Sequence, residues 1–222
     1  MTSGVLLKDI KAEDFPKSVI LTDDPLRAKM LTAHHLEYAV LKYEQDDELL
    51  YFGSYGQTAI ALAATGFDSG TVAGFDSGAV AGFNSGAVTG FVDVLIGLGV
   101  EEVIYIGACV STDSRYALRT VVLADGGSDD LIGRARTAAK KHNIPVVTCK
   151  VSQCDVGGVA EREPVIDDVT GGLYKQAELA GVEALSVLTV SENSVTGEII
   201  EEHERRSRFY AAARLVFETL AS

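Results

Sequence analysis

The cysteine and histidine side chains, which could act in catalysis or bind a metal, are few and widely spaced in this sequence. Its three cysteines, Cys109, Cys149 and Cys154, lack C-x-x-C spacing, and the first two lie in apolar runs. We therefore expect buried free thiols rather than catalytic or metal-binding groups. The four histidines show no ligand spacing, so we predict no metal site.

Arg27 lies two residues after Pro25, and a proline suits the first turn of a helix. A guanidinium can hold an anion through two parallel hydrogen bonds. The nearby carboxylates of Asp23 and Asp24 offer it an internal partner instead. Two hypotheses therefore stand for Arg27: it binds an anionic ligand, or it pairs with one of these two acids at the start of a helix.

Four short motifs follow one another between about residues 18 and 220. They are Leu21-Thr-Asp-Asp-Pro-Leu-Arg-Ala28, then Ala64-Thr-Gly66, then Gly99-Val-Glu-Glu-Val-Ile-Tyr-Ile-Gly-Ala-Cys109 with Leu118-Arg-Thr-Val-Val122, and finally Ala184-Leu-Ser-Val-Leu-Thr-Val-Ser-Glu-Asn193. Each motif is weak alone. The ordered set resembles the purine/uridine nucleoside phosphorylase family, whose members carry G-D-P-x-R-A, A/S-T-G, G-V-x-x-I-I-R-x-G-S/T with L-R-D-V-V, and A-L-x-I-x-T-V-S-D-N/H. The resemblance implies an α/β fold, a three-layer α/β/α sandwich with a central mixed sheet.

Members of that family cleave the glycosidic bond of a nucleoside with phosphate, which releases the base and a pentose 1-phosphate. This chemistry needs donors around the phosphate, a carboxylate near the ribose hydroxyls and a proton for the departing base. By resemblance, Arg27 binds phosphate and Glu192 is the catalytic acid. Thr65, Gly66 and Asp168 are implied to bind the nucleoside. The Val-Ser-Glu-Asn sequence favours the purine branch of the family over the uridine branch.

The resemblance implies no cofactor, with phosphate as co-substrate if the chain is a phosphorylase. It also implies a small-molecule nucleoside as partner and a homo-oligomer, either a dimer or a hexamer.

Several phosphate-binding positions depart from the family's pattern. Asp23 replaces the loop glycine, Tyr105 replaces the strand arginine, and Ala108 replaces the Ser/Thr that follows. A phosphate 4 Å from a carboxylate is repelled by roughly 4 kcal/mol at an effective dielectric of about 20. We therefore expect phosphate to bind poorly.

The nucleoside side departs as well. The family's M-E-x-E-like ribose segment falls near Val169, where Asp167 and Asp168 lie one or two places away from the family's acids. Glu192 adds a methylene to the family's aspartate, which moves the proton donor by about 1.5 Å, and such a misplacement can cost roughly a hundredfold in rate. The alternatives are that Asp168 is a turn residue and that Glu192 is a solvated or helix-capping carboxylate.

Three functions remain open. The chain is a divergent nucleoside phosphorylase or nucleosidase, a catalytically silent relative that binds a nucleoside or another small ligand, or a structural or interaction protein that keeps the fold. A nucleosidase would explain the lost phosphate donors, because water needs no anion site. The alternative to catalysis is therefore a ligand-binding or structural role.

The elements that must position these residues alternate between strands and helices, as in α/β proteins. Short apolar, β-branched runs predict buried strands at 18–21, 49–52, 58–63, 102–106, 120–123, 145–149 and 184–190. Helical patterns predict helices at 25–36, 130–142 and 173–180, and one long closing helix at 196–220. No Pro/Ser-rich linker divides the chain, so we expect a single domain over residues 1–222.

The composition excludes several partners. A net charge of −13 and a sequence pI of about 4.7 repel nucleic-acid backbones and anionic membranes. The sequence has no apolar run of the roughly 20 residues that span a bilayer and no signal-peptide pattern at its start. We expect a cytoplasmic protein.

A Gly-rich octapeptide repeat occupies residues 66–91. It reads GFDSGTVA, GFDSGAVA, GFNSGAVT and then GFVDVLIG, with glycine at every fourth position from Gly66 to Gly90. Glycine is unfavourable inside a helix, whereas Asp-Ser-Gly suits turns and helix starts. Three explanations remain open: a tolerated surface duplication, an insertion that contacts a partner, and a calcium-binding β-roll, although that pattern needs more acids and a nine-residue period.

Deleting residues 67–82 tests the duplication hypothesis, since it removes two copies and leaves a single turn. We expect the shortened chain to fold with a nearly unchanged melting temperature, because loop length changes closure entropy by only about 0.6 kcal/mol per doubling. Thermal unfolding and size-exclusion chromatography provide the measurement. An insoluble variant, or one with a different oligomeric state, would favour the partner-contact explanation.

Overall fold

The computed structural model describes residues 10–45, 47–66, 94–95, 97–152 and 163–222. The octapeptide repeat and Cys154 therefore lie outside the described residues, except for Gly66. The strands are β1 (Ser18–Thr22), β2 (Glu37–Gln45), β3 (Glu48–Tyr55), β4 (Thr58–Thr65), β5 (Glu102–Ser111), β6 (Val121–Ala124), β7 (Val146–Cys149), β8 (Val151–Ser152), β9 (Val165–Ile166), β10 (Glu183–Asn193) and β11 (Glu198–Ile199). The helices are a 3-10 turn at Ala12–Asp14, α1 (Pro25–His35), α3 (Asp129–Lys141), α4 (Thr170–Ala180), α5 (Glu202–Ser207) and α6 (Tyr210–Leu220).

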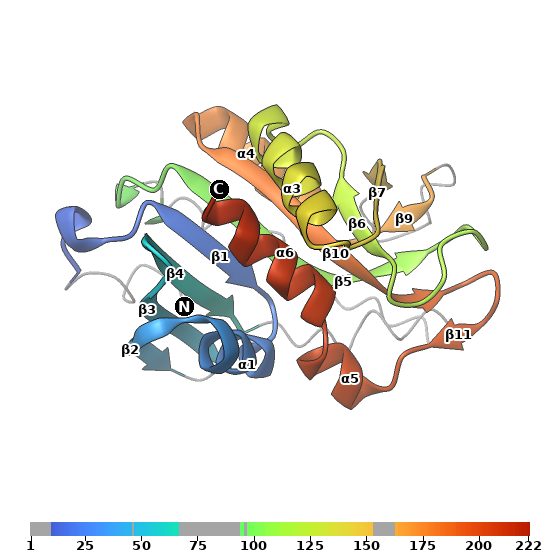
Figure 1. The fold of residues 1–222 in the computed structure, drawn as a ribbon, viewed down its shortest axis with the longest axis horizontal. Helices are drawn as coiled ribbons and strands as arrows, with labels where there is room; N and C mark the ends of the chain where they lie inside the picture. The colour runs from blue at the N-terminus through green and yellow to red at the C-terminus, as the bar shows by residue number, and fades with distance from the viewer. Residues whose placement is uncertain (1–9, 46, 67–93, 96, 153–162) are drawn as a thin grey trace.

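The described strands form one mixed sheet in the order β2-β3-β4-β1-β5-β10-β6-β7, with β11 beside β10 and β9 beside β5 and β8 (Figure 1). Strands β4, β1, β5 and β10 are parallel neighbours at its centre. Each of the seven predicted strands is present, because a strand that is covered on both faces carries a continuous apolar run. The edge strand β2 was not predicted; it is exposed along most of its length and carries charged residues between its apolar ones.

Two apolar clusters lie on opposite faces of the sheet. One joins α1, α3 and α6 to side chains such as Ile104, Ile106, Leu185 and Val187. The other joins α4 and the segment around Leu95 to the alternate residues of the same strands. The predicted three-layer α/β/α arrangement around a mixed sheet is therefore confirmed.

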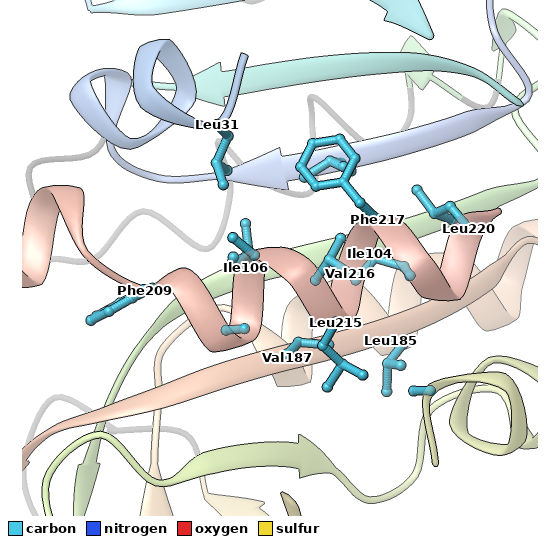
Figure 2. Packing of buried hydrophobic residues seen from close by; sticks show 14 of the residues in the cluster. Leu31, Ile104, Ile106, Leu185, Val187, Phe209, Leu215, Val216, Phe217 and Leu220 are labelled. Atoms are coloured by element: carbon cyan, nitrogen blue, oxygen red, sulfur yellow. The ribbon is translucent and has the colours of Figure 1, made fainter. Parts of the chain in front are cut away.

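Helix α6 runs across the middle of one face (Figures 1 and 2). Figure 2 shows its side chain Leu215 beside Val187 of β10 and Val216 beside Ile104 of β5, whereas the ring of Phe217 projects to the other side of the helix axis, toward β1. Phe217 is fully buried and its ring stacks on His35 of α1 at a centroid distance of 4.6 Å. This packing joins α1 and α6 above the central strands.

The single closing helix predicted at 196–220 is wrong, because the chain turns back first. The side chain of Asn193 accepts hydrogen bonds from the backbone N–H groups of Val195 and Thr196, and Gly197 has a φ of 72°. These features make a tight turn that sends β11 antiparallel along β10. The helical pattern begins only afterwards and is divided into α5 and α6.

An ion cluster around Glu218 links α6 to its neighbours, and it makes the stability of the fold depend on pH. Burial opposes the ionisation of Glu218, but hydrogen bonds from Tyr55, His142 and Lys141 outweigh it and lower the pKa of Glu218 from 4.5 to about 2. A carboxylate with a depressed folded-state pKa stabilises the fold above its unfolded pKa. That contribution is lost as the pH falls from about 4.5 towards 2.

We expect Glu218→Gln to lower the free energy of unfolding by about 1–2 kcal/mol at pH 7, after allowance for solvent screening. The difference from the unmodified chain should shrink to less than half at pH 3, because the carboxylate's contribution is already fading there. Urea unfolding at the two pH values measures this. Glu178→Gln, on the exposed side of α4, is the control and should show neither effect.

Candidate functional site at the carboxyl ends of the central strands

The carboxyl ends of the parallel strands β4, β1, β5 and β10 meet at one edge of the sheet. In the register of these strands, Thr22 at the end of β1 pairs with Ala64, and Ser111 at the end of β5 pairs with Asn193. In α/β sheets, ligands bind at such an edge, where loops and helix starts gather. The structure brings Arg27, Thr65 and Glu192 to this edge from three separate segments.

Arg27 is buried in the first turn of α1. Its Nη1 donates to Asp23 Oδ1 at 2.5 Å and to Thr22 Oγ1 at 3.0 Å. Its Nη2 donates to the backbone carbonyl of Arg205 at 3.1 Å. The guanidinium also lies over the ring of Phe209, 4.8 Å from its centroid. Of the two sequence hypotheses, the internal ion pair is the arrangement present here, and its partner is Asp23.

Asp24 makes different contacts from those of Asp23. Its Oδ1 accepts hydrogen bonds from the N–H groups of Leu26 and Arg27, which caps α1. Its carboxylate also binds Arg206 of α5, with Nε 2.8 Å from Oδ2. The two adjacent acids therefore hold two different arginines.

Glu192 lies near the end of β10 and is half-buried. The pairing of β10 with β5 shifts register between Val190 and Glu192, and such an irregularity re-aims the side chains that follow it. Burial raises the pKa of Glu192 above its ordinary value, while the positive charge of Arg205 opposes the rise. The charge of Arg205 therefore acts on the Glu192 carboxyl group. Burial has the larger effect, and it favours the protonated form.

Arg205 was missed by sequence reasoning. It stands in the run Glu-Glu-His-Glu-Arg-Arg-Ser-Arg, which is typical of a solvated helix. In the structure it is buried, whereas Arg206 next to it is half-exposed. No residue-type signal distinguishes the two, since only the placement of α5 over the sheet edge decides which one faces inward.

Helix α5 is held over this edge by ion pairs on both sides. Arg206 binds Asp24, as described above, and Arg119 binds Glu204 through Nε and Nη2 at 2.5 and 2.8 Å. Arg119 belongs to the Leu-Arg-Thr-Val-Val motif and has a positive φ of 70°. These contacts fix the helix that carries Arg205.

Thr65 and Gly66 end β4. The hydroxyl oxygen of Thr65 is buried and finds no hydrogen-bond partner among the described residues. Gly66 has a φ of 77°, and a Cβ there would lie 3.2 Å from Asp47, so the turn requires glycine for two reasons.

Asp167 and Asp168 begin α4. Asp167 is buried, and its oxygens accept hydrogen bonds from the N–H groups of Val169 and Thr170 and from the Thr170 hydroxyl. Burial raises the pKa of Asp167 to about 6, although these hydrogen bonds lower it. Asp168 is only half-buried. The predicted nucleoside-binding aspartate therefore lies beside a buried acid whose oxygens are already engaged with Val169 and Thr170.

Other reactive groups give no site in the part of the chain that the structure describes. Cys109 is a buried free thiol, as predicted, and burial raises its pKa well above the ordinary value. Cys149 is a half-buried free thiol, and burial raises its pKa to about 11. No group of three His, Cys, Asp or Glu side chains within the described ranges could hold a metal ion. None of the described helices is long and apolar enough to cross a membrane.

Comparison with known proteins agrees with the motif order. No protein-family profile matches the chain. The chain is 27% identical to a DeoD-type purine nucleoside phosphorylase of Shewanella oneidensis, over 93% of this chain and 94% of that protein. It is 24% identical to the corresponding protein of Bacillus velezensis, over 92% and 94%.

The fold has a close counterpart among solved structures. A purine nucleoside phosphorylase from Toxoplasma gondii, in complex with immucillin-H, superposes with a TM-score of 0.77. The match covers 96% of this chain and 93% of that one, at 14% identity. Its three-layer architecture is the one found here. Together with the four ordered motifs and the curated relatives, this similarity supports a divergent member of the nucleoside phosphorylase family.

Proposed function

We propose that the chain binds a purine nucleoside at the carboxyl edge of its sheet and cleaves the N-glycosidic bond, with Glu192 as the acid. The observation that carries this proposal is the half-buried carboxyl of Glu192, whose pKa is raised by burial and moderated by the charge of Arg205. The names of the relatives support the substrate class, since they are purine nucleoside phosphorylases. The Val-Ser-Glu-Asn sequence supports a purine base.

The chemistry follows from the bond that breaks. As the C–N bond lengthens, its electron pair moves onto the base, which becomes a poor leaving group unless a donor neutralises the charge. A protonated Glu192 supplies that proton, and its raised pKa increases the protonated fraction at neutral pH. Arg205 then stabilises the carboxylate that remains. The acceptor that attacks the sugar is either phosphate or water.

The remaining site residues have supporting roles in this proposal. Thr65 and the backbone of Gly66 would contact the nucleoside, and Asp168 would face the sugar. We also infer a homo-oligomer, a dimer or a hexamer as the resemblance implies. The edge strand β2 supports it, because Tyr38, Val40 and Leu41 are 87%, 51% and 44% exposed.

A catalytically silent nucleoside-binding protein is the second candidate, and one observation favours it. The oxygens of the buried acid nearest the expected ribose position, Asp167, are engaged at the start of α4. Without a carboxylate free to orient the ribose, the sugar would be held loosely and the bond would break slowly.

Incubation with a panel of purine and pyrimidine nucleosides, with and without phosphate, tests the proposal. Release of free base from a purine nucleoside supports the enzyme. No release, together with a nucleoside-dependent rise in melting temperature, supports the silent binder. If no nucleoside is cleaved and none raises the melting temperature, both the enzyme and the silent nucleoside-binding protein are ruled out.

A further inference from the structure

By the motif resemblance described above, Asp23, Tyr105 and Ala108 stand at positions where the family binds phosphate. We propose that the carboxylate of Asp23 is a built-in anion that fills the site around Arg27, so that this site does not bind inorganic phosphate. This inference concerns anion binding alone and stands whether or not the nucleoside function is correct.

The first argument is that Arg27 is fully enclosed. The side chains of Arg27 and Asp23 are only 3% and 5% exposed, and Nη1 lies 2.5 Å from Asp23 Oδ1. The other contacts of the guanidinium go to Thr22, to the carbonyl of Arg205 and to the face of Phe209. Nε is buried and has no hydrogen-bond partner among the described residues, and an anion at Nη1 would have to displace the Asp23 carboxylate.

The second argument concerns Tyr105, which stands where the family carries an arginine. Its hydroxyl is hydrogen-bonded to Asp23, and the side chain is buried. Burial raises the pKa of Tyr105 well above the ordinary value, and the negative charge of Asp23 adds to the rise. The tyrosine is therefore a neutral donor, aimed at the internal carboxylate and not at a ligand.

The third argument is that the backbone is adapted to this tyrosine. A Cβ added at Gly107 would lie 2.3 Å from the Tyr105 hydroxyl oxygen, closer than real contacts allow. Gly107 therefore leaves the space that the phenol ring fills. The tyrosine, the glycine and the two charged residues form one packed unit.

The charges of this unit cancel without any ligand. Arg27 contributes one positive charge, Asp23 contributes one negative charge, and Tyr105 contributes none. A phosphate placed beside Asp23 at about 4 Å would be bound roughly a thousandfold more weakly than beside a neutral residue. The carboxylate of Asp23 thus forms the ion pair with Arg27 that a bound phosphate would otherwise form.

The decisive experiment is Asp23→Ala, because it opens the space and leaves Arg27 without a counter-charge. Inorganic phosphate should bind this variant with a sub-millimolar Kd by calorimetry. At about 100 times that Kd it should raise the melting temperature by roughly 5–10 °C, compared with chloride at the same ionic strength. The unmodified chain should show neither effect.

Two further variants serve as controls. Asp24→Asn removes a neighbouring charge but keeps a capping residue, and it should not respond to phosphate. Asp23→Ala combined with Arg27→Met removes both charges and should not respond either. If Asp23→Ala does not fold in phosphate or in chloride, phosphate binding is measured on the isosteric Asp23→Asn, which removes the charge and keeps the shape.

Two results would overturn the proposal. One is sub-millimolar phosphate binding by the unmodified chain. The other is a folded Asp23→Ala, or Asp23→Asn in its place, that phosphate does not stabilise. Because no nucleoside is present, these results are distinguishable from a failure of the proposed function.

Discussion

Glu192→Gln is expected to lower the rate of base release from a purine nucleoside by about 10²–10⁴-fold, the usual contribution of a general acid. The amide keeps the size of the side chain and can still donate a weak hydrogen bond, but it cannot transfer a proton to the leaving base. The KM should change far less than kcat, because the lost interaction is one that strengthens only as the bond breaks. Steady-state rates of free base formation give the measurement.

The pH dependence separates proton donation from a merely structural role. The acid form of Glu192 is lost as the pH rises through its raised pKa, so the rate should fall in that direction. In Arg205→Met the opposing positive charge is gone, so this pKa should rise further and the falling limb should move to higher pH. Glu198→Gln, on the exposed strand β11, is the control and should leave both rate and profile unchanged. A Glu192→Gln variant with full activity would show that another group protonates the base.

The largest effect on stability is expected from Arg27→Met, at about 3–5 kcal/mol of the free energy of unfolding. The substitution keeps most of the length of the side chain but leaves the carboxylate of Asp23 buried opposite a neutral group. Tyr105 and Thr22 remain as partners, yet neither supplies a positive charge. Urea unfolding at pH 7 measures the loss.

Arg206→Met is the matched control, because Arg206 is the arginine that binds the adjacent acid. Its side chain is 31% exposed, and Asp24 keeps the backbone N–H groups of Leu26 and Arg27 as donors, so the cost should be smaller, at about 1–2 kcal/mol. Asp23→Ala introduced together with Arg27→Met should recover part of the loss, since it removes the stranded charge. Equal costs for the two single arginine substitutions would contradict the buried ion pair.

Sequence patterns located the central strands because those strands are buried on both faces and must be apolar without interruption. The same patterns located α1, which follows a capping aspartate and begins with a proline, and α3, whose last turn is basic. They could not locate β2, since an exposed edge strand need not be apolar. They also misread residues 196–199, where the Asn193 side chain and the positive φ of Gly197 favour a turn over the helix suggested by the later residues.

By itself, the order of the four motifs determined the family and the three-layer fold, because each motif occupies a strand end or turn that the architecture needs in that sequence. The resemblance also implied that Asp23, Tyr105 and Ala108 stand at phosphate-donor positions. Only the tertiary structure decided that Asp23 and Tyr105 contact each other, since they are 82 positions apart and meet only when β1 pairs with β5. The tertiary structure likewise decided that Arg205 is buried while Arg206 is half-exposed. Adjacent residues of one type carry the same local signal, and their burial depends on the surface against which the helix packs.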